Sequence, residues 1–376
     1  MRRIRFLKIH LRTHPVRSVP PMAYIKQVDS SHQRKDVVIR ADCNKRIGSG
    51  HIVRCSAIAD AAARRGASAL FVVSDEESAT SLRNDGIDCV VLEGDCMELH
   101  AGDGQSLGSL CCEVGASSVL VDTYAVNDTF FEALNNAAGD GCKVAWIDDW
   151  YTYELGEQTA PIARQVDCVV NYSLGMIPVE YEKAYTGAKT ELCVSPRFAP
   201  LRPQFSPYDN RVYGALERIM VTTGSTNDSH LLEQMTEACL EAVPDAQIDV
   251  IVGSMAEFIR FDDSRVVEHR GVTDLAPFMR ASDLCVCAAG TTLYELSAIG
   301  VPSIAIPTVD NQRPNAAGLK QLGLGFVVDT GAQMRDELIG ALEKMAANPR
   351  LRGEFVAKMH EAVDGRGAER IARKLY

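Results

Sequence analysis

The sequence predicts an α/β protein built from two doubly wound domains. From Val37 onward, short β-branched runs alternate with Ala- and Leu-rich amphipathic stretches, a pattern typical of a parallel sheet covered by helices. A proline-rich segment at 196–212 interrupts this alternation, which then resumes. The length of 376 residues, at roughly 150 residues per domain, also suits two domains.

The first half starts with a strand at 37–40, a glycine-containing turn, a helix at about 52–65 and a strand at 69–73, which form one βαβ unit. The alternation continues through strands at 89–92, 118–121, 143–147 and 168–171, with helices at 76–84 and 129–138. We therefore predict an N-terminal Rossmann-like domain over residues 37–200.

The segment 196–212 contains four prolines and no apolar period, so it is the predicted joint between the domains. The second half is predicted to contain strands at 218–222, 248–252, 266–269, 284–288 and 303–307, with helices at 231–242, 275–281 and 293–299. We predict a C-terminal Rossmann-like domain over residues 201–376. Ligands of open α/β sheets bind beyond the carboxyl ends of the strands, so we expect a site in a cleft where the two domains face each other.

The charge is divided unevenly along the chain. Nine Lys and Arg residues against Asp29 and Asp36 give residues 1–36 a charge of +7, and the net charge of -11 leaves -18 for the remainder. The basic segment lacks the apolar region of a secretory signal, so we interpret it as a flexible tail or as the product of an early start codon, with Met22 as the alternative start. A nucleic-acid-binding arm is a weaker alternative.

The acidic remainder argues against broad binding to nucleic acid or to an anionic membrane surface. We expect small-molecule partners, no nucleic acid, no membrane span and a monomer. The twelve cysteines include no Cys-x-x-Cys pair, which argues against a zinc site. They are better interpreted as small buried residues of a protein in the reducing cytoplasm.

The turn after the first strand contains the first candidate motif. Arg40 and Asp42 end the strand, Gly48 and Gly50 allow a close approach of the backbone to an anion, and His51 opens the next helix. A third glycine, which a dinucleotide-binding loop needs, is absent from this turn. The alternative for His51 is a helix-start residue satisfied by the backbone.

Two further motifs follow strands of the first and second halves. Asp122 could orient a base or a sugar hydroxyl and Tyr124 could stack or donate a hydrogen bond, or the pair could be a helix cap and a rim aromatic. Asp148-Asp149, after the strand at 143–147, is more simply structural. Gly224 and Ser225 suit a phosphate or a sugar face, or a capped helix.

The fourth motif is the most specific. Gly290, Thr291 and Thr292 lie at a predicted helix start and can donate backbone and hydroxyl hydrogen bonds to a diphosphate. Glu295, one turn later, can accept both hydroxyls of a ribose. The alternative for Glu295 is an ordinary first-turn carboxylate that favours the helix dipole.

Taken together, these residues resemble the GT-B superfamily of nucleotide-sugar enzymes. The motifs at 40–42, 47–55, 121–124, 147–149, 196–203 and 290–295, followed by Asn311-Gln312, look like those of the UDP-2,4-diacetamido-2,4,6-trideoxy-β-L-altropyranose hydrolase of pseudaminic acid biosynthesis. The resemblance runs from about Val38 to Val328. It implies two Rossmann-like domains facing across a cleft, the GT-B fold, and a hydrolase that frees the sugar from UDP without a metal or other cofactor.

The resemblance also assigns roles. His51 corresponds to the catalytic histidine, which would act as a base or positioner of the attacking water. The expected UDP-binding residues are Gly290, Thr291, Thr292, Glu295, Val272, Gly224 and Ser225. The expected sugar-binding residues are Arg40, Asp42, Gly48, Gly50, Tyr124, Asn311 and Gln312. No Asp-x-Asp sequence occurs to hold a metal on the diphosphate.

Two other functions stay open at the level of sequence. A UDP-sugar-dependent glycosyltransferase of the same fold would use the same donor site with an alcohol in place of water. A nucleotide-sugar-binding protein without catalysis is the third hypothesis, and the concentration of polar residues at the strand ends argues against it.

Overall fold

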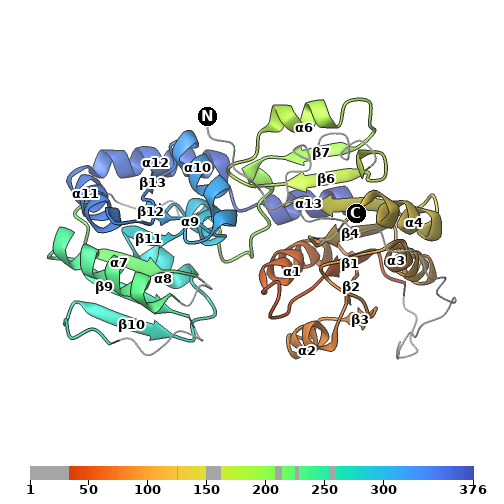
Figure 1. Ribbon diagram of the computed structural model, residues 1–376, viewed down its shortest axis with the longest axis horizontal. Helices are drawn as coiled ribbons and strands as arrows, with labels where there is room; N and C mark the ends of the chain where they lie inside the picture. The colour runs from red at the N-terminus through yellow and green to blue at the C-terminus, as the bar shows by residue number, and fades with distance from the viewer. Residues whose placement is uncertain (1–33, 125, 150–161, 208–213, 225–227, 254–259) are drawn as a thin grey trace. The chain divides into compact units, whose positions relative to one another are not determined.

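Two parallel sheets organise the part of the chain that the structure describes (Figure 1). The structure is a computed structural model, and it describes residues 34–124, 126–149, 162–207, 214–224, 228–253 and 260–376. Within these ranges, no helix is both long and apolar enough to cross a membrane.

The first sheet has the strand order β3-β2-β1-β4-β5-β6-β7. Its strands are β1 (Val37–Ala41), β2 (Ala69–Val73), β3 (Cys89–Val91), β4 (Ser118–Asp122), β5 (Lys143–Ile147), β6 (Cys168–Asn171) and β7 (Glu191–Val194). All five residues of β1 are buried, as expected of a central strand covered on both faces. The order changes direction between β1 and β4, where Ala41 lies opposite Asp122, so a switch point lies at the carboxyl ends of these two strands.

Helices connect the parallel strands of this sheet. They are α1 (Gly50–Ala63), α2 (Glu76–Asn84), α3 (Ala101–Glu113), α4 (Asp128–Ala138) and α6 (Pro178–Ala184). Local sequence sets several starts: the Asp75 side chain caps α2 at the Ser78 N–H, and the Asn127 side chain caps α4 at the Phe130 N–H. Helices α3 and α4 pack closely because α3 has glycines at the contact: a Cβ on Gly108 would lie 2.4 Å from the Leu134 carbonyl oxygen.

The second sheet has the order β10-β9-β8-β11-β12-β13. Its strands are β8 (Arg218–Thr222), β9 (Gln247–Val252), β10 (Val266–Arg270), β11 (Leu284–Ala288), β12 (Ser303–Ile306) and β13 (Phe326–Val327). Its helices are α7 (Ser229–Ala242), α8 (Ala276–Ala281), α9 (Thr292–Ile299), α10 (Arg313–Leu322), α11 (Met334–Ala347) and α12 (Pro349–Ala362). Two 3-10 turns, η2 (Pro196–Phe198) and η3 (Asp310–Gln312), lie in connections. Gly300 ends α9 in the left-handed region at φ 86°, a conformation that favours glycine.

The last helix, α13 (Gly367–Leu375), packs on elements of the first sheet, against α1, η2 and β4 (Figure 1). Its apolar residues Ala368, Ile371, Ala372 and Leu375 are buried in the same core cluster as the α1 residues. The helix begins with a close backbone contact, because a Cβ on Gly367 would lie 2.1 Å from the Ala199 carbonyl oxygen. The C-terminal end of the chain therefore belongs structurally to the first sheet.

Candidate active site

Three consecutive strands of the first sheet end in or beside polar groups that converge on α1. Asp122 ends β4, Asp149 follows β5 and Tyr172 follows β6, and these strands are neighbours in the order β4-β5-β6. Helix α1 follows β1 at the same edge, and His51 and Arg54 lie three residues apart on it. This spacing places both side chains on one face of the helix.

His51 is bonded to Asp122. The His51 Nδ1 atom lies 2.8 Å from the Asp122 Oδ1 atom and 3.2 Å from the Asp122 carbonyl oxygen. Both residues are almost fully buried, at 2% and 1% exposure. The Tyr124 ring packs edge-on against the imidazole, with the ring centroids 4.5 Å apart. The carboxylate fixes the orientation of the imidazole, as in sites where a histidine acts as a base.

Arg54 holds the carboxylates of the site together. Its Nε atom donates to Asp122 Oδ2 at 2.6 Å, and its Nη2 atom donates to Asp122 Oδ1 and, at 2.6 Å, to Asp149 Oδ2. Its Nη1 atom donates to the Tyr172 hydroxyl at 2.9 Å. The guanidinium also lies over the Tyr172 ring, 5.8 Å from the centroid. One arginine thus contacts the polar groups after β4, β5 and β6.

The electrostatics of the site follow from burial and from this arginine. Burial by itself would raise the pKa of Asp122, but the charges of Arg54 and His51 outweigh burial and hold that pKa well below its usual range. Burial raises the pKa of Tyr172 well above its usual value, so its hydroxyl is a neutral hydrogen-bonding group. Asp122 is therefore an ionised carboxylate inside the protein.

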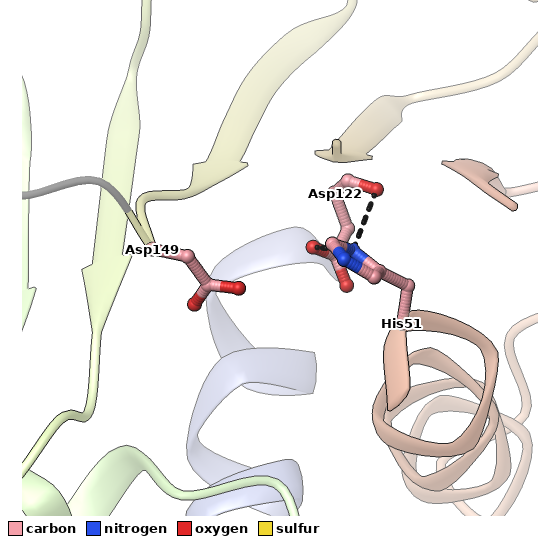
Figure 2. A group of neighbouring side chains, drawn as sticks. All are labelled: His51, Asp122 and Asp149. Carbon is pink, nitrogen blue, oxygen red and sulfur yellow. Dashed lines mark hydrogen bonds and ion pairs between the residues drawn. The ribbon is translucent and has the colours of Figure 1, made fainter. Parts of the chain in front are cut away.

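The side chains of His51, Asp122 and Asp149 are close enough to resemble a metal site (Figure 2). Each offers a ligand atom, and these atoms lie within 4.8 Å of one another. However, Arg54 Nη2 bonds both carboxylates and lies 3.1 Å from His51 Nδ1. The positive charge that two carboxylates need is supplied at this place by the guanidinium.

A buried network fixes the chain next to Asp149. The Tyr181 hydroxyl donates to Asp148 Oδ2 at 2.6 Å, and Asn171 Nδ2 donates to the Asp148 carbonyl oxygen at 2.7 Å. Asp148 is fully buried, whereas the Asp149 side chain is 27% exposed. Asp148 therefore has the structural role that the sequence favoured for the pair, and Asp149 reaches the site.

The second nitrogen of His51 is buried. Within the described residues, its Nε2 atom has no hydrogen-bond acceptor or donor. If Nδ1 carries the proton that faces Asp122, the neutral imidazole presents a lone pair at Nε2. A proton acceptor at this position is what a general base requires.

The residues expected to bind UDP lie around the start of α9. Gly290 and Thr291 directly precede the helix, Thr292 is its first residue, and Thr291 is exposed. No side-chain cap is formed at this helix start by the described residues, and the N–H groups of Leu293 and Tyr294 donate to the carbonyl oxygens of Gly290 and Thr291 at 3.2 and 3.0 Å. Glu295 lies in the first turn, and burial raises its pKa to about 7, with the Arg202 charge opposing the rise.

Other expected ligand residues surround this helix start. The Gln312 amide lies next to Gly290, since a Cβ at Gly290 would be 3.7 Å from Gln312 Nε2, and Gln312 Oε1 accepts the Thr308 N–H at 3.0 Å. Asn311 is exposed in η3. Val272 lies in the connection between β10 and α8.

The Gly224 and Ser225 loop follows β8. Gly224 has a φ of 66°, in the left-handed region. Ser225 lies outside the described residues. The contact of either residue with UDP stays a prediction.

Arg40 and Asp42 form a buried ion pair beneath the first motif. Asp42 Oδ1 accepts the Ser74 N–H at 2.6 Å and the Ser74 hydroxyl at 2.8 Å. The pair therefore joins the ends of β1 and β2, and its contact with a sugar stays a prediction. Gly48 turns the chain at φ 73° and Gly50 is the first residue of α1, so both shape the approach to His51.

Two tyrosines connect the His51 site with α9. The Tyr172 ring packs edge-on against the Tyr294 ring, with centroids 5.3 Å apart. The Tyr294 hydroxyl donates to Asn315 Oδ1 at 2.7 Å and accepts the Leu174 N–H at 3.2 Å. Tyr294 directly precedes Glu295, so the candidate nucleotide-binding helix contacts a residue that binds Arg54.

The site residues predicted from the sequence do not include Arg54, Asp149 or Tyr172. The spacing of Arg54 could have identified it, because an arginine three residues after His51 lies on the same face of the helix as His51. Asp149 was visible as a polar residue after a strand. Tyr172 could not be singled out, because the order of β5 and β6 in the sheet was unknown.

Comparison with known proteins defines the class of fold. The model of the glycosyltransferase family 28 C-terminal domain matches residues 218–373. The crystal structure of Acinetobacter baumannii MurG matches with a TM-score of 0.65 and 15% sequence identity, over 91% of this chain and 99% of that one. The protein therefore has the GT-B fold of two Rossmann-like domains with parallel sheets, as the sequence predicted.

Two curated proteins are similar in sequence. The spore coat polysaccharide biosynthesis protein SpsG of Bacillus subtilis (strain 168) is 24% identical over 227 residues, 57% of this chain and 66% of that protein. The UDP-N-acetylglucosamine--N-acetylmuramyl-(pentapeptide) pyrophosphoryl-undecaprenol N-acetylglucosamine transferase of Acidiphilium cryptum (strain JF-5) is 38% identical over 106 residues, 27% of this chain and 28% of that protein. The chain thus matches just under two thirds of the first and about a quarter of the second. These matches support a likeness to GT-B transferases, and the narrower likeness to the hydrolase stays a prediction.

Proposed function

We propose that this protein is a UDP-sugar-dependent glycosyltransferase, in which His51 removes the proton of an acceptor hydroxyl. The observation that carries the proposal is the buried His51–Asp122 pair, whose Nε2 atom has no partner among the described residues. It lies at the carboxyl edge of a sheet, where α/β proteins bind ligands. The glycosyltransferase family match to the second half and the transferase relatives support the same class of reaction.

The proposed donor is a UDP-sugar held at the start of α9. The relative from Acidiphilium cryptum is named for a UDP-N-acetylglucosamine donor. The N–H groups at the start of α9 would bind the diphosphate, and Glu295 would accept hydrogen bonds from the ribose. An anionic leaving group is stabilised by such fixed donors.

The proposed reaction is a displacement at the anomeric carbon. An oxygen of the acceptor forms a bond to that carbon while the bond from the carbon to the diphosphate oxygen breaks, and its electron pair leaves with UDP. The acceptor proton passes to Nε2 of His51. Asp122 would stabilise the resulting imidazolium through Nδ1–H, which is the role of a carboxylate paired with a catalytic histidine.

Hydrolysis is the second candidate, and one observation favours it. The His51 side chain is only 3% exposed and is covered on one side by the Tyr124 ring. Water is the nucleophile that fits such a covered base with the least rearrangement. The sequence motifs that resemble the diacetamido-trideoxy-sugar hydrolase of pseudaminic acid biosynthesis support the same outcome.

UDP release with and without acceptors tests the proposal. The protein is incubated with UDP-N-acetylglucosamine and with the UDP-linked 2,4-diacetamido-2,4,6-trideoxy sugar, in heavy-oxygen water, and products are analysed by mass spectrometry. Release that depends on an acceptor supports the transferase, whereas acceptor-independent release with heavy oxygen on the sugar supports the hydrolase.

The His51→Ala variant tests the role of the base. We expect it to lose turnover by about 10²–10⁴-fold, the usual contribution of a general base, while UDP binding measured by calorimetry is unchanged. His230→Ala, at an exposed histidine of α7, is the matched control and should retain full activity. Parental turnover in His51→Ala would exclude this mechanism.

A further inference from the structure

Arg54 occupies an unusual place, since all the polar groups of the site meet at its guanidinium. Its Nε and Nη2 atoms contact both oxygens of Asp122, and Nη2 also contacts Asp149. The arginine side chain is 12% exposed, and the Asp122 side chain is fully buried. Two carboxylates this close repel each other, and the cation between them offsets that repulsion.

The hydrogen atoms of Arg54 decide which nitrogen of His51 carries a proton. The Nη2 atom has two hydrogens, and its contacts with Asp122 Oδ1 and Asp149 Oδ2 use both. No hydrogen of Nη2 is left for His51 Nδ1, although the two atoms are 3.1 Å apart. Nδ1 must therefore donate its own hydrogen to Asp122, at 2.8 Å, and the lone pair of the neutral ring lies at Nε2.

We propose that Arg54 is a positioning residue for His51: its guanidinium locks Asp122 in place and thereby fixes the His51 tautomer that presents Nε2 as the proton acceptor. This inference rests on the proposed function, because it assigns a task to an arginine within the same site. Arg54 does not contact the reacting atoms in this role. It acts through Asp122, and Asp149 and Tyr172 hold the guanidinium at the correct angle.

The planar fork of arginine is essential to this role. The Nε and Nη2 atoms donate parallel hydrogen bonds to the two oxygens of one carboxylate, which a lysine ammonium cannot do. Arg54→Lys keeps the positive charge but loses the planar pair of donors. Arg54→Met keeps most of the aliphatic side chain but loses both the charge and the donors. Arg83→Met, which removes an exposed ion pair with Glu76 on α2, is the matched control.

The first measurement does not depend on activity. Nitrogen-15 NMR of the labelled protein should show a hydrogen-bonded proton on His51 Nδ1 in the parent and in Arg83→Met. In Arg54→Met, this proton should exchange with water at least tenfold faster, with an intermediate rate in Arg54→Lys. An unchanged Nδ1 proton in Arg54→Met would overturn the proposal, as would a parent in which the proton lies on Nε2.

The second measurement is kinetic. With the UDP-sugar that the parent uses, Arg54→Met should lower kcat by roughly 10–100-fold, as removal of an orienting neighbour does in other sites, with KM for the donor within about twofold. Arg54→Lys should recover part of kcat. A large rise in KM with kcat unchanged would instead mean that Arg54 binds the donor, and the proposal would be wrong.

The two measurements separate this inference from the proposed function. If the parent turns over no UDP-sugar, the proposed function fails, while the NMR comparison still decides whether Arg54 fixes the tautomer. If Arg54→Met does not fold, Arg54→Lys carries the test, because lysine can still neutralise the carboxylates. Parental exchange and parental kcat in folded Arg54→Lys would overturn the requirement for the fork.

Discussion

Asp122 is held as a buried anion, and under the proposed function it contributes to both stability and catalysis. Its oxygens accept hydrogen bonds from Arg54 and His51, and the Cys55 thiol lies 3.2 Å from Oδ2. Because its pKa is lowered in the folded protein, the stability it contributes is fully present above the unfolded value of about 3.9 and is lost as the pH falls below it. This residue therefore contributes to acid denaturation.

Asp122→Asn tests that double role. We expect the free energy of unfolding to fall by about 3–5 kcal/mol, because Arg54 keeps its buried charge and loses its main partner. Urea denaturation measures this loss, and turnover should fall by about 10²–10⁴-fold because the amide supports the wrong tautomer of His51. Asp95→Asn is the control: its ion pair with Arg46 is exposed to solvent, so its loss should leave the urea denaturation midpoint close to that of the parent.

If Glu295 binds the ribose as proposed, we expect it to make nucleoside binding depend on pH. Burial raises its pKa from 4.5 to about 7, so the protonated carboxyl is favoured by the fold and stability declines as the pH rises from 4.5 to about 7. The ionised carboxylate accepts hydrogen bonds from ribose hydroxyls more strongly than the protonated form does. Uridine, which has no phosphate to titrate, should therefore bind more tightly above pH 7 than below it.

Calorimetry with uridine on either side of pH 7 measures that change. In Glu295→Gln both the affinity for uridine and the stability should lose their dependence on pH in this range. An unchanged pH profile for uridine in Glu295→Gln would show that another group is responsible.

The sequence allowed prediction of those site residues that directly follow a strand or begin a helix. His51, Asp122 and Tyr124 were identified because each stands at a strand end or helix start, where parallel sheets place ligands. Arg54, Asp149 and Tyr172 meet only after the strand order β4-β5-β6 is set, and that order depends on tertiary packing.

Among the elements, α3 shows how packing overrides local preference. It contains three glycines in 13 residues, a poor composition for a helix, and it was not predicted from the sequence. Two of those glycines lie against α4: a Cβ on Gly104 would be 2.2 Å from the Phe130 carbonyl oxygen. Two of the three glycines that weaken the isolated helix, Gly104 and Gly108, therefore permit the close contact with α4.

Gly108→Ala and Gly102→Ala, on the same helix, should have opposite effects. The first places a methyl group 2.4 Å from the Leu134 carbonyl oxygen and should lower the free energy of unfolding by about 1–3 kcal/mol through overpacking. Gly102→Ala has open space around its Cβ. It should raise the free energy of unfolding by up to about 1 kcal/mol, since alanine favours a helix. Equal effects in thermal unfolding would contradict this account of the contact.

Elements with strong local patterns were predicted to within about three residues, including β1, β8 and β11. The short strands β7 and β13 and the helix α6 were not predicted, because a few residues at the edge of a sheet carry little periodicity. Pairing with a neighbouring strand, which the sequence does not reveal, makes β7 part of the first sheet.

For the whole molecule, α13 joins distant parts of the chain. A variant that ends at Gly365 lacks this helix and exposes the apolar surface of α1 against which it packs. Amide hydrogen exchange should then accelerate in α1 and β4. The amides of α7, a helix of the half of the chain that contains the second sheet, should keep their parental protection. Uniform acceleration in both sheets would show that α13 stabilises the molecule globally.

The same helix sets a constraint on synthesis. Helix α1 ends at Ala63, and the helix that covers it begins at Gly367, after every strand of both sheets has been made. On the ribosome, the helix that carries His51 therefore emerges early but keeps an uncovered apolar face until the second sheet has followed it. The candidate active site can mature only late in translation, and a nascent chain stalled before Gly367 should depend on chaperones to stay out of aggregates.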